Sequence, residues 1–285
     1  MARERITYEI EGAGWPADPS LGLGPDECFR CTHLLGVINK PALVGWAGKV
    51  EGQAWEEALR ASLPSFEPAA MVDPTLCGPE GWAEGFIAQV KASKGKQKAA
   101  DKRKDEAADI GKRAHAWIEW SLKLEMGQDA GKEPACEGPV AGLRDAWLEW
   151  RKLRNFVPLA TEKLCLSVED RWAGTLDILG EVEGRATVID IKSSNGIWPE
   201  QCMQVAAYCI GAASLAGRSE VLEGLILRLP KTEEGYAKLL EETGRPFEER
   251  YLDQAEVVEH YQAFLAAKEL HNCMRRLDRA AKEGR

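Results

Sequence analysis

The sequence predicts a layered α/β protein in which a small mixed sheet is flanked by helices. Short runs with an apolar residue at every second position lie between residues 161 and 229, and this spacing is typical of strands. Longer segments on both sides carry apolar residues at three- and four-residue spacing, which is typical of amphipathic helices. Strands bordered by such helices favour a sheet covered on its faces.

The composition is that of a globular protein, with 45% hydrophobic and 29% charged residues among 285. No run approaches the roughly 18 apolar residues of a membrane span. The N-terminus lacks a basic-then-apolar signal peptide, so we expect no membrane contact and a cytoplasmic location. Eight irregularly spaced cysteines are expected to be reduced thiols. The formal charge of −9 argues against a generally basic nucleic-acid-binding surface but leaves room for a local one.

Residues 1–100 are expected to form a mostly helical region packed on a core made by residues 101–285. Arg5–Ile10 fits a short edge strand, and a loop rich in Gly and Pro follows it. Apolar residues over Leu34–Ile38 predict a buried helical turn, and Trp46–Leu63 predicts a longer helix.

The pair Cys28-x-x-Cys31, with His33 nearby, resembles half of a zinc site. No second closely spaced pair follows it in the sequence, so ordinary buried thiols are favoured over a structural metal.

The segment Lys91–Arg113 holds nine Lys/Arg residues and four Asp/Glu residues in an otherwise acidic chain. It is either a solvated helix face or an arm that contacts phosphates. It runs into a helix predicted over Lys102–Glu125, where His115 and Glu119 lie one turn apart on one face. As an arm it would bind DNA through Lys102, Arg103, Lys104, Lys112 and Arg113.

Beyond a polar linker over Gly127–Pro139, the patterns predict the remaining elements in order. These are a helix over Val140–Arg154, a strand over Thr161–Val168 with Glu162 near its start, two strands within Ala173–Lys192, a helix over Pro199–Leu215, a strand over Gly224–Leu229 with a partner over Gly235–Leu240, and a final helix over Leu252–Lys282.

The two central strands, joined by a turn at Glu183-Gly184, carry charged residues among apolar ones. Side chains alternate along a strand, so the first strand is expected to place Asp177 on one face with Thr175 and Leu179. The second strand is expected to place Asp190 and Lys192 on one face with Val188, while Ile189 and Ile191 point into an apolar layer. The hairpin therefore presents Asp177, Asp190 and Lys192 together.

Two carboxylates and an ammonium at one spot are costly unless a divalent metal and a phosphate complete the site. The alternative is that Asp177 and Asp190 are surface acids paired with Lys192. Acids in the middle of otherwise apolar strands are poor strand formers and are seldom placed there without a partner. The pattern therefore favours a metal site.

The order His115, Asp177, Asp190-Ile191-Lys192 and Gln204-x-x-x-Tyr208 resembles the PD-(D/E)XK nuclease superfamily, in particular its RecB-like branch. The stretches GVINKPALVGWAGK, AADIGKRAHAWIE, AGTLDIL, VIDIKSS and QVAAY look like the stand-alone nucleases of phages and mobile elements. The resemblance spans roughly residues 32–265. One departure is Leu176, which stands before Asp177 where the family name has proline.

This resemblance implies a restriction-endonuclease-like core over residues 101–285 with helical N- and C-terminal additions. It implies a Mg²⁺- or Mn²⁺-dependent deoxyribonuclease with His115, Asp177, Asp190 and the Ile191 carbonyl as metal ligands. Lys192 would orient or deprotonate the attacking water. Gln204 and Tyr208 would hold Lys192 or a DNA phosphate, and Glu162 would be a second-metal or supporting carboxylate.

The resemblance favours an exonuclease on DNA ends or single strands, serving recombination, replication or repair in a bacterial or phage-infected cell. A recombinase or a single-strand-binding protein is a possible partner. The alternatives are a structure-selective endonuclease and an inactive DNA-binding protein on the same core. Relatives with an iron–sulfur cluster have three closely spaced C-terminal cysteines, but here only Cys273 lies in that region, so we expect no such cluster. No phosphate-binding motif of an ATP-driven motor occurs in the sequence.

Overall fold

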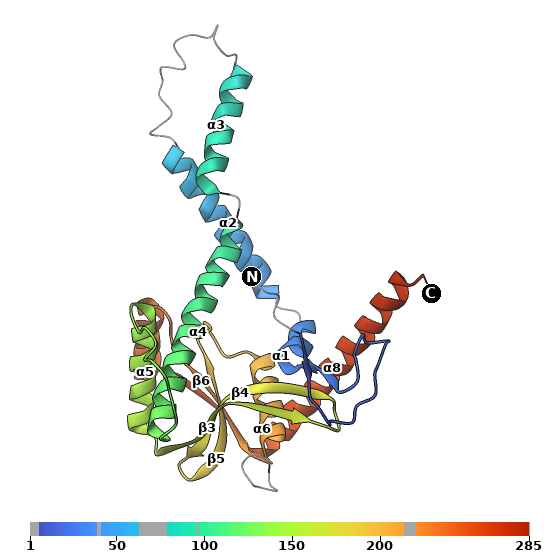
Figure 1. Cartoon of the computed structure of the whole chain (residues 1–285). Helices are drawn as coiled ribbons and strands as arrows, with labels where there is room; N and C mark the ends of the chain where they lie inside the picture. Colours follow the sequence, from blue (N-terminus) through green and yellow to red (C-terminus); the bar gives the residue numbers. More distant parts are fainter. Residues whose placement is uncertain (1–5, 39–40, 63–78, 96, 214–220, 285) are drawn as a thin grey trace. The chain divides into compact units, whose positions relative to one another are not determined.

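The computed structural model describes residues 6–38, 41–62, 79–95, 97–213 and 221–284 (Figure 1). The chain divides into two compact units: unit 1 comprises Met1–Ile38 and Ile110–Arg285, and unit 2 comprises Asn39–Asp109. This division differs from the expected boundary at residue 100. The first strands of the chain pair with the central sheet, so the N-terminal residues belong to the same unit as the core.

Unit 2 is a helical hairpin continued by the start of a third helix. Its helices are α2 (Pro41–Ser62), α3 (Pro79–Lys94) and the first part of α4 (Ala99–Glu125). Lys94 Nζ lies 3.0 Å from Glu51 Oε2, and this ion pair joins α3 to α2. The helix expected over Trp46–Leu63 is thus confirmed over its described part, since residue 63 lies outside the described residues.

Unit 1 contains a seven-stranded mixed sheet, which confirms the predicted α/β class for the described chain. The strands follow the order β1-β2-β4-β5-β6-β7, and β3 pairs with β4. The pairs β2–β4 and β5–β6 are parallel, and the other pairs are antiparallel. The strand bounds are β1 Thr7–Glu9, β2 Glu27–Arg30, β3 Phe156–Ser167, β4 Trp172–Val182, β5 Arg185–Lys192, β6 Glu223–Arg228 and β7 Glu248–Leu252.

Helices of unit 1 cover both faces of this sheet, and each face has its own apolar cluster (Figure 1). On one face lie α5 (Pro139–Leu153) and the second part of α4. On the other lie α6 (Pro199–Ala212), α8 (Gln254–Lys282) and the short α1 (Cys31–Leu34), which leads into a 3-10 turn over Leu35–Val37. We call the two sides of the β4–β5 pair the α4 face and the α6 face.

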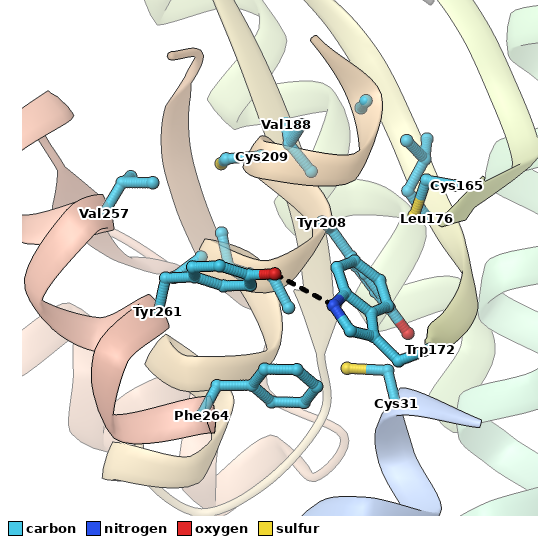
Figure 2. Packing of buried hydrophobic residues seen from close by; sticks show 14 of the residues in the cluster. Cys31, Cys165, Trp172, Leu176, Val188, Tyr208, Cys209, Val257, Tyr261 and Phe264 are labelled. Carbon is cyan, nitrogen blue, oxygen red and sulfur yellow. Dashed lines mark hydrogen bonds between the residues drawn. The ribbon is translucent and has the colours of Figure 1, made fainter. Parts of the chain in front are cut away.

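The cluster on the α6 face ties the C-terminal helix to the sheet (Figure 2). Trp172 of β4 is fully buried, and its indole Nε1 donates a hydrogen bond to the Tyr261 hydroxyl of α8 at 3.0 Å. Phe264, one turn further along α8, packs edge-on against the same indole. Burying these aromatic groups contributes about 25 cal/mol for each Å² of apolar surface removed from water. The final helix is therefore an integral part of unit 1.

The expected strand over Gly235–Leu240 is wrong, because these residues lie in helix α7 (Glu233–Thr243). Thr232 caps this helix by accepting the Gly235 N–H at its Oγ1, and Gly244 ends it in the left-handed conformation with φ of 71°. Both are ordinary helix-end signals. The true partner of β6 is β7, which the sequence patterns did not reveal.

The described residues contain no helix that is both long and apolar enough to cross a membrane.

Candidate metal centre

The central feature of the site is the point where β4 and β5 separate. Their pairing runs from Val182↔Arg185 to Ile178↔Ile189 and ends there, one residue before Asp177 and Asp190. At that point the Ile191 N–H donates to Asp177 Oδ2 at 2.8 Å. A side-chain carboxylate thus replaces the backbone carbonyl that a continuing sheet would supply. The gap lets the backbone of Ile191 face a polar site.

The strand on the other side of β4 is also irregular here. The β3–β4 register shifts between Pro158 and Ala160. Glu162 lies between Thr161, which pairs with Ile178, and Lys163, which pairs with Leu176, and it has a left-handed φ of 48°. Residues other than glycine seldom adopt this conformation, and where they do it often marks a functional site. The irregularity brings the Glu162 carboxylate beside Asp177.

Helix α4 adds His115 to these two acids. Apolar residues of α4 such as Ile118 and Leu122 are buried against the sheet and fix the helix there. His115 Nε2 then lies 3.1 Å from the Ile191 carbonyl oxygen, and its Nδ1 lies 3.5 Å from Asp177 Oδ2. Ligand atoms of His115, Glu162 and Asp177 all lie within 4.8 Å of one another. The predicted imidazole and the predicted Ile191 carbonyl therefore meet on the α4 face.

The electrostatics of the α4 face favour a cation. Burial of its carboxylate, with repulsion from Asp177 and Glu119, raises the pKa of Glu162 to about 7, although the residue keeps an exposed surface. The nearby Lys123 of α4 forms an ion pair with Glu119 instead, with its Nζ 2.5 Å from Glu119 Oε1. One imidazole nitrogen, two carboxylates and a backbone carbonyl suit Mg²⁺ or Mn²⁺, and the imidazole tilts the preference toward Mn²⁺. The residues present fit the predicted metal.

The α6 face holds the other two charged groups as a buried pair. Lys192 Nζ lies 2.5 Å from Asp190 Oδ2, and the two side chains are 21% and 1% exposed. Burial raises the pKa of Asp190; attraction to Lys192 opposes that shift, and repulsion from Asp177 adds to it. Burial acts to lower the pKa of Lys192, but attraction to Asp190 and Asp177 outweighs it and raises that pKa. The Lys192 ammonium is thus stabilised in its charged form by the Asp190 carboxylate beside it.

The group of possible metal ligands in the structure therefore differs from the expected ligands. Asp190 is not a member of the group whose ligand atoms lie within 4.8 Å of one another, whereas Glu162 is. Neither oxygen of Asp190 has a hydrogen bond of good geometry from the described residues. Asp177, Asp190 and Lys192 nonetheless remain electrostatic neighbours, as the predicted hairpin requires.

One expected detail of β4 is wrong. Thr175, Asp177 and Leu179 were expected to share a face, but Leu179 packs in the cluster on the α6 face while Asp177 meets His115 on the α4 face. Ile178 belongs to the cluster on the α4 face as well. The alternation of side chains is therefore interrupted between Asp177 and Leu179, beside the irregular part of β3.

Gln204 and Tyr208 lie one turn apart on α6, and Asp190 influences Tyr208 electrostatically. Gln204 Nε2 donates to the Tyr208 hydroxyl at 3.1 Å, and Tyr208 is 2% exposed within the apolar cluster (Figure 2). Its ring rests against Gly174 of β4, where any β-carbon would overlap it. This burial suits a support for Asp190 better than a contact with DNA.

The predicted DNA-binding residues are divided between the two units, because α4 crosses their boundary. Lys102, Arg103 and Lys104 belong to unit 2, where Lys102 is 68% exposed and lies 4.0 Å from Glu106. Lys112 and Arg113 belong to unit 1 and directly precede the turn that carries His115.

The cysteine pair does not form a joint site. Cys28 and Cys31 are both fully buried, and they lie in different apolar clusters. Burial raises the pKa of Cys28 to about 11 and raises that of Cys31 as well. These are the properties of buried structural thiols.

The loop after Lys192 carries no motif that a pattern search would reveal, yet it borders the site. Ser193 follows Lys192 directly, and its Oγ lies 3.1 Å from where a β-carbon on Gly111 of α4 would stand. The sequence does contain one signal for a fixed loop. Gln201 is the third residue of α6, and its side-chain oxygen accepts a hydrogen bond from the Trp198 N–H just before the helix.

No protein-family model matches this chain, and no curated protein matches it at a significant level. The functional conclusion therefore depends on the residues of the site and their arrangement.

Proposed function

We propose that this protein is a metal-dependent DNA nuclease of the RecB-like PD-(D/E)XK type that hydrolyses phosphodiester bonds, and that it acts as an exonuclease on DNA ends or single strands. The observation that supports this most is the gap between β4 and β5. It sets Asp177, His115 and the Ile191 carbonyl on one face, with the Asp190–Lys192 pair directly behind them.

The α4 face would hold the metal through His115, Glu162, Asp177 and the Ile191 carbonyl. When bound, Mg²⁺ or Mn²⁺ supplies a water of lowered pKa and polarises the scissile phosphate. His115 is oriented for this role because its two ring nitrogens are fixed by Ile191 and Asp177. A ring fixed in this way loses little further freedom on binding.

Lys192 would stabilise negative charge on the scissile phosphate. Its ammonium group stays charged because Asp190 lies beside it in a buried position. A cation held in place stabilises charge that develops on the phosphoryl oxygens, and it needs no rearrangement during the reaction. Asp190 is then a positioning residue for Lys192, and Tyr208, which is hydrogen-bonded to Gln204, lies close enough to feel the charge of Asp190.

The basic residues of α4 supply the second requirement of a nuclease, which is attraction to a polyanion. Lys102 and Lys112 are both exposed, and Lys112 precedes His115 by three residues on the same helix. Such residues would bind phosphates in a salt-dependent and sequence-independent way.

The test is a time course on linear, circular and single-stranded DNA labelled at either end, with Mg²⁺, Mn²⁺ or EDTA. We expect linear and single-stranded DNA to be shortened from an end with metal only, and circular DNA to survive. Asp177→Asn and Lys192→Met should abolish cleavage, because each removes a charge at the site.

The matched control is Asp145→Asn, which neutralises an exposed acid on α5 and should leave the rate unchanged. Cleavage of circular DNA would replace the exonuclease by an endonuclease. Cleavage in EDTA, or full activity of Asp177→Asn, would overturn the metal-dependent assignment. Metal and DNA binding without cleavage would indicate the inactive DNA-binding alternative.

A further inference from the structure

The loop over Ser193–Trp198 is held rigidly beside the site. Leu229 N–H of the strand end next to it donates to the Lys192 carbonyl at 2.8 Å. The Ser194 hydroxyl donates to the Gly196 carbonyl at 2.7 Å, and Gln201 Nε2 donates to Ser194 Oγ at 3.2 Å. The Trp198 N–H donates in turn to Gln201 Oε1 at 3.0 Å. One buried glutamine thus fixes both ends of the loop.

This rigid loop presents an exposed indole. Trp198 is 47% exposed, whereas Trp147, Trp150 and Trp172 of the same unit are fully buried. Three atoms of its ring lie 3.4–3.8 Å from where a β-carbon on Gly196 would stand, so the ring lies over the glycine. Leaving an aromatic surface in water forgoes its burial energy. An exposed ring on a fixed loop suits a ligand with a flat apolar face.

A short loop joins the indole to Lys192. Trp198 is six residues from Lys192, and an extended chain of that length spans at most ~20 Å. The loop also touches α4 at Gly111, one turn before His115. A DNA strand whose phosphate contacts Lys192 would need to extend by only a few nucleotides to meet Trp198.

We propose that Trp198 is a stacking platform for an unpaired base of the substrate strand, so that the substrate class is single-stranded or frayed DNA rather than intact duplex. This role in cleavage rests on the proposed nuclease function. Every base has a flat π face, so stacking on one aromatic side chain is tolerant of sequence and is worth about five- to 150-fold in affinity. A base inside a duplex cannot expose that face.

The test measures binding without cleavage, by fluorescence anisotropy of labelled oligonucleotides in EDTA. One oligonucleotide is a normal single strand, and the other is abasic throughout but equal in length and charge. We expect Trp198→Ala and Trp198→Leu to weaken binding of the normal strand about tenfold and to leave binding of the abasic strand within twofold. Trp198→Phe should retain most of the affinity, because it keeps an aromatic face.

The control is Leu277→Ala, which removes a 65% exposed apolar side chain from α8 and should change neither affinity. Equal losses on both oligonucleotides, or a Phe variant as weak as the Leu variant, would overturn the stacking role. So would the absence of any loss. The Phe and Leu variants preserve bulk, so this comparison decides even if the Ala variant folds poorly.

The same variants separate this inference from the nuclease assignment. With metal, Trp198→Ala should raise KM for single strands about tenfold and leave kcat within twofold. Suppose that the wild type cleaves DNA, but that Trp198→Ala does not weaken binding of the normal strand more than binding of the abasic strand. The nuclease assignment then stands, and the stacking role of Trp198 is wrong. If the base-dependent difference is present but no metal supports cleavage, the platform stands as a binding site and the nuclease fails.

Discussion

The two faces of the β4–β5 pair hold acids of the same type in opposite circumstances. Asp177 on the α4 face is 17% exposed and lies beside His115, with Glu162 next to both. Asp190 on the α6 face is 1% exposed and lies against Lys192. On the α4 face the carboxylates repel each other, whereas on the α6 face the carboxylate already has its counterion.

This difference indicates that the two acids of the hairpin have different roles. In the described chain no lysine or arginine forms an ion pair with Asp177 or Glu162, so this open pair of acids is suited to take a cation from solution. A buried acid beside a lysine is suited to keep that lysine charged and in place, since an unpaired charge there would be strongly destabilising. The comparison therefore separates a face suited to bind a metal ion from a face that keeps Lys192 charged and in place.

The largest expected effect comes from breaking the buried pair. Asp190→Ala leaves the Lys192 ammonium without its partner, so the free energy of unfolding should fall by about 3–5 kcal/mol. Asp177→Ala removes one hydrogen bond from Ile191 at a partly exposed position and should cost about 1 kcal/mol. Urea denaturation of the metal-free proteins measures both values.

The control for this comparison is the double variant Asp190→Leu with Lys192→Met, which removes both charges and should recover much of the lost stability. If Asp177→Ala proved as costly as Asp190→Ala, the distinction between the two faces would be wrong.

An intermediate effect is expected from the packing beneath the buried pair. Gly174→Ala places a β-carbon into the ring of Tyr208, which is confined within the apolar cluster, so unfolding should become easier by about 1–3 kcal/mol. Gly142→Ala on α5 is the matched control. It meets nothing within 4 Å and should gain up to ~1 kcal/mol from helix propensity. Equal stability of the two variants in urea would show that Tyr208 is free to move.

The smallest effect on stability is expected on the α4 face, where the consequence is for binding. Glu162→Gln removes one of the grouped carboxylates and should weaken Mn²⁺ binding about 10–100-fold. The metal-free variant should be no less stable than the wild type at neutral pH and above, because the neutral amide removes a carboxylate whose charged form is disfavoured by burial and by repulsion from Asp177. Isothermal titration calorimetry measures the affinity, and Glu169→Gln, an exposed acid outside the group, is the control. Unchanged affinity for Mn²⁺ would remove Glu162 from the site.

Local patterns determined most of the elements. The period-two placement of side chains around Asp177 and Asp190 identified β4 and β5. The structure buries both faces of these two strands, as is typical of central strands between helical layers. Helical spacing likewise identified α4 and α8. Gly235–Leu240 was misassigned because a hydrophobic pattern does not register the capping threonine, Thr232, that begins helix α7.

The sequence by itself determined which residue types stand where: an acid within each central strand, a lysine two positions after the second, and a histidine on the helix before them. Only the tertiary structure decided which acid faces the open side. That choice depends on the separation of β4 from β5 and on the left-handed conformation of Glu162, whose carboxylate lies near Asp177. Both arise from pairing between strands distant in sequence, and such pairing can override the simple alternation of side chains along one strand.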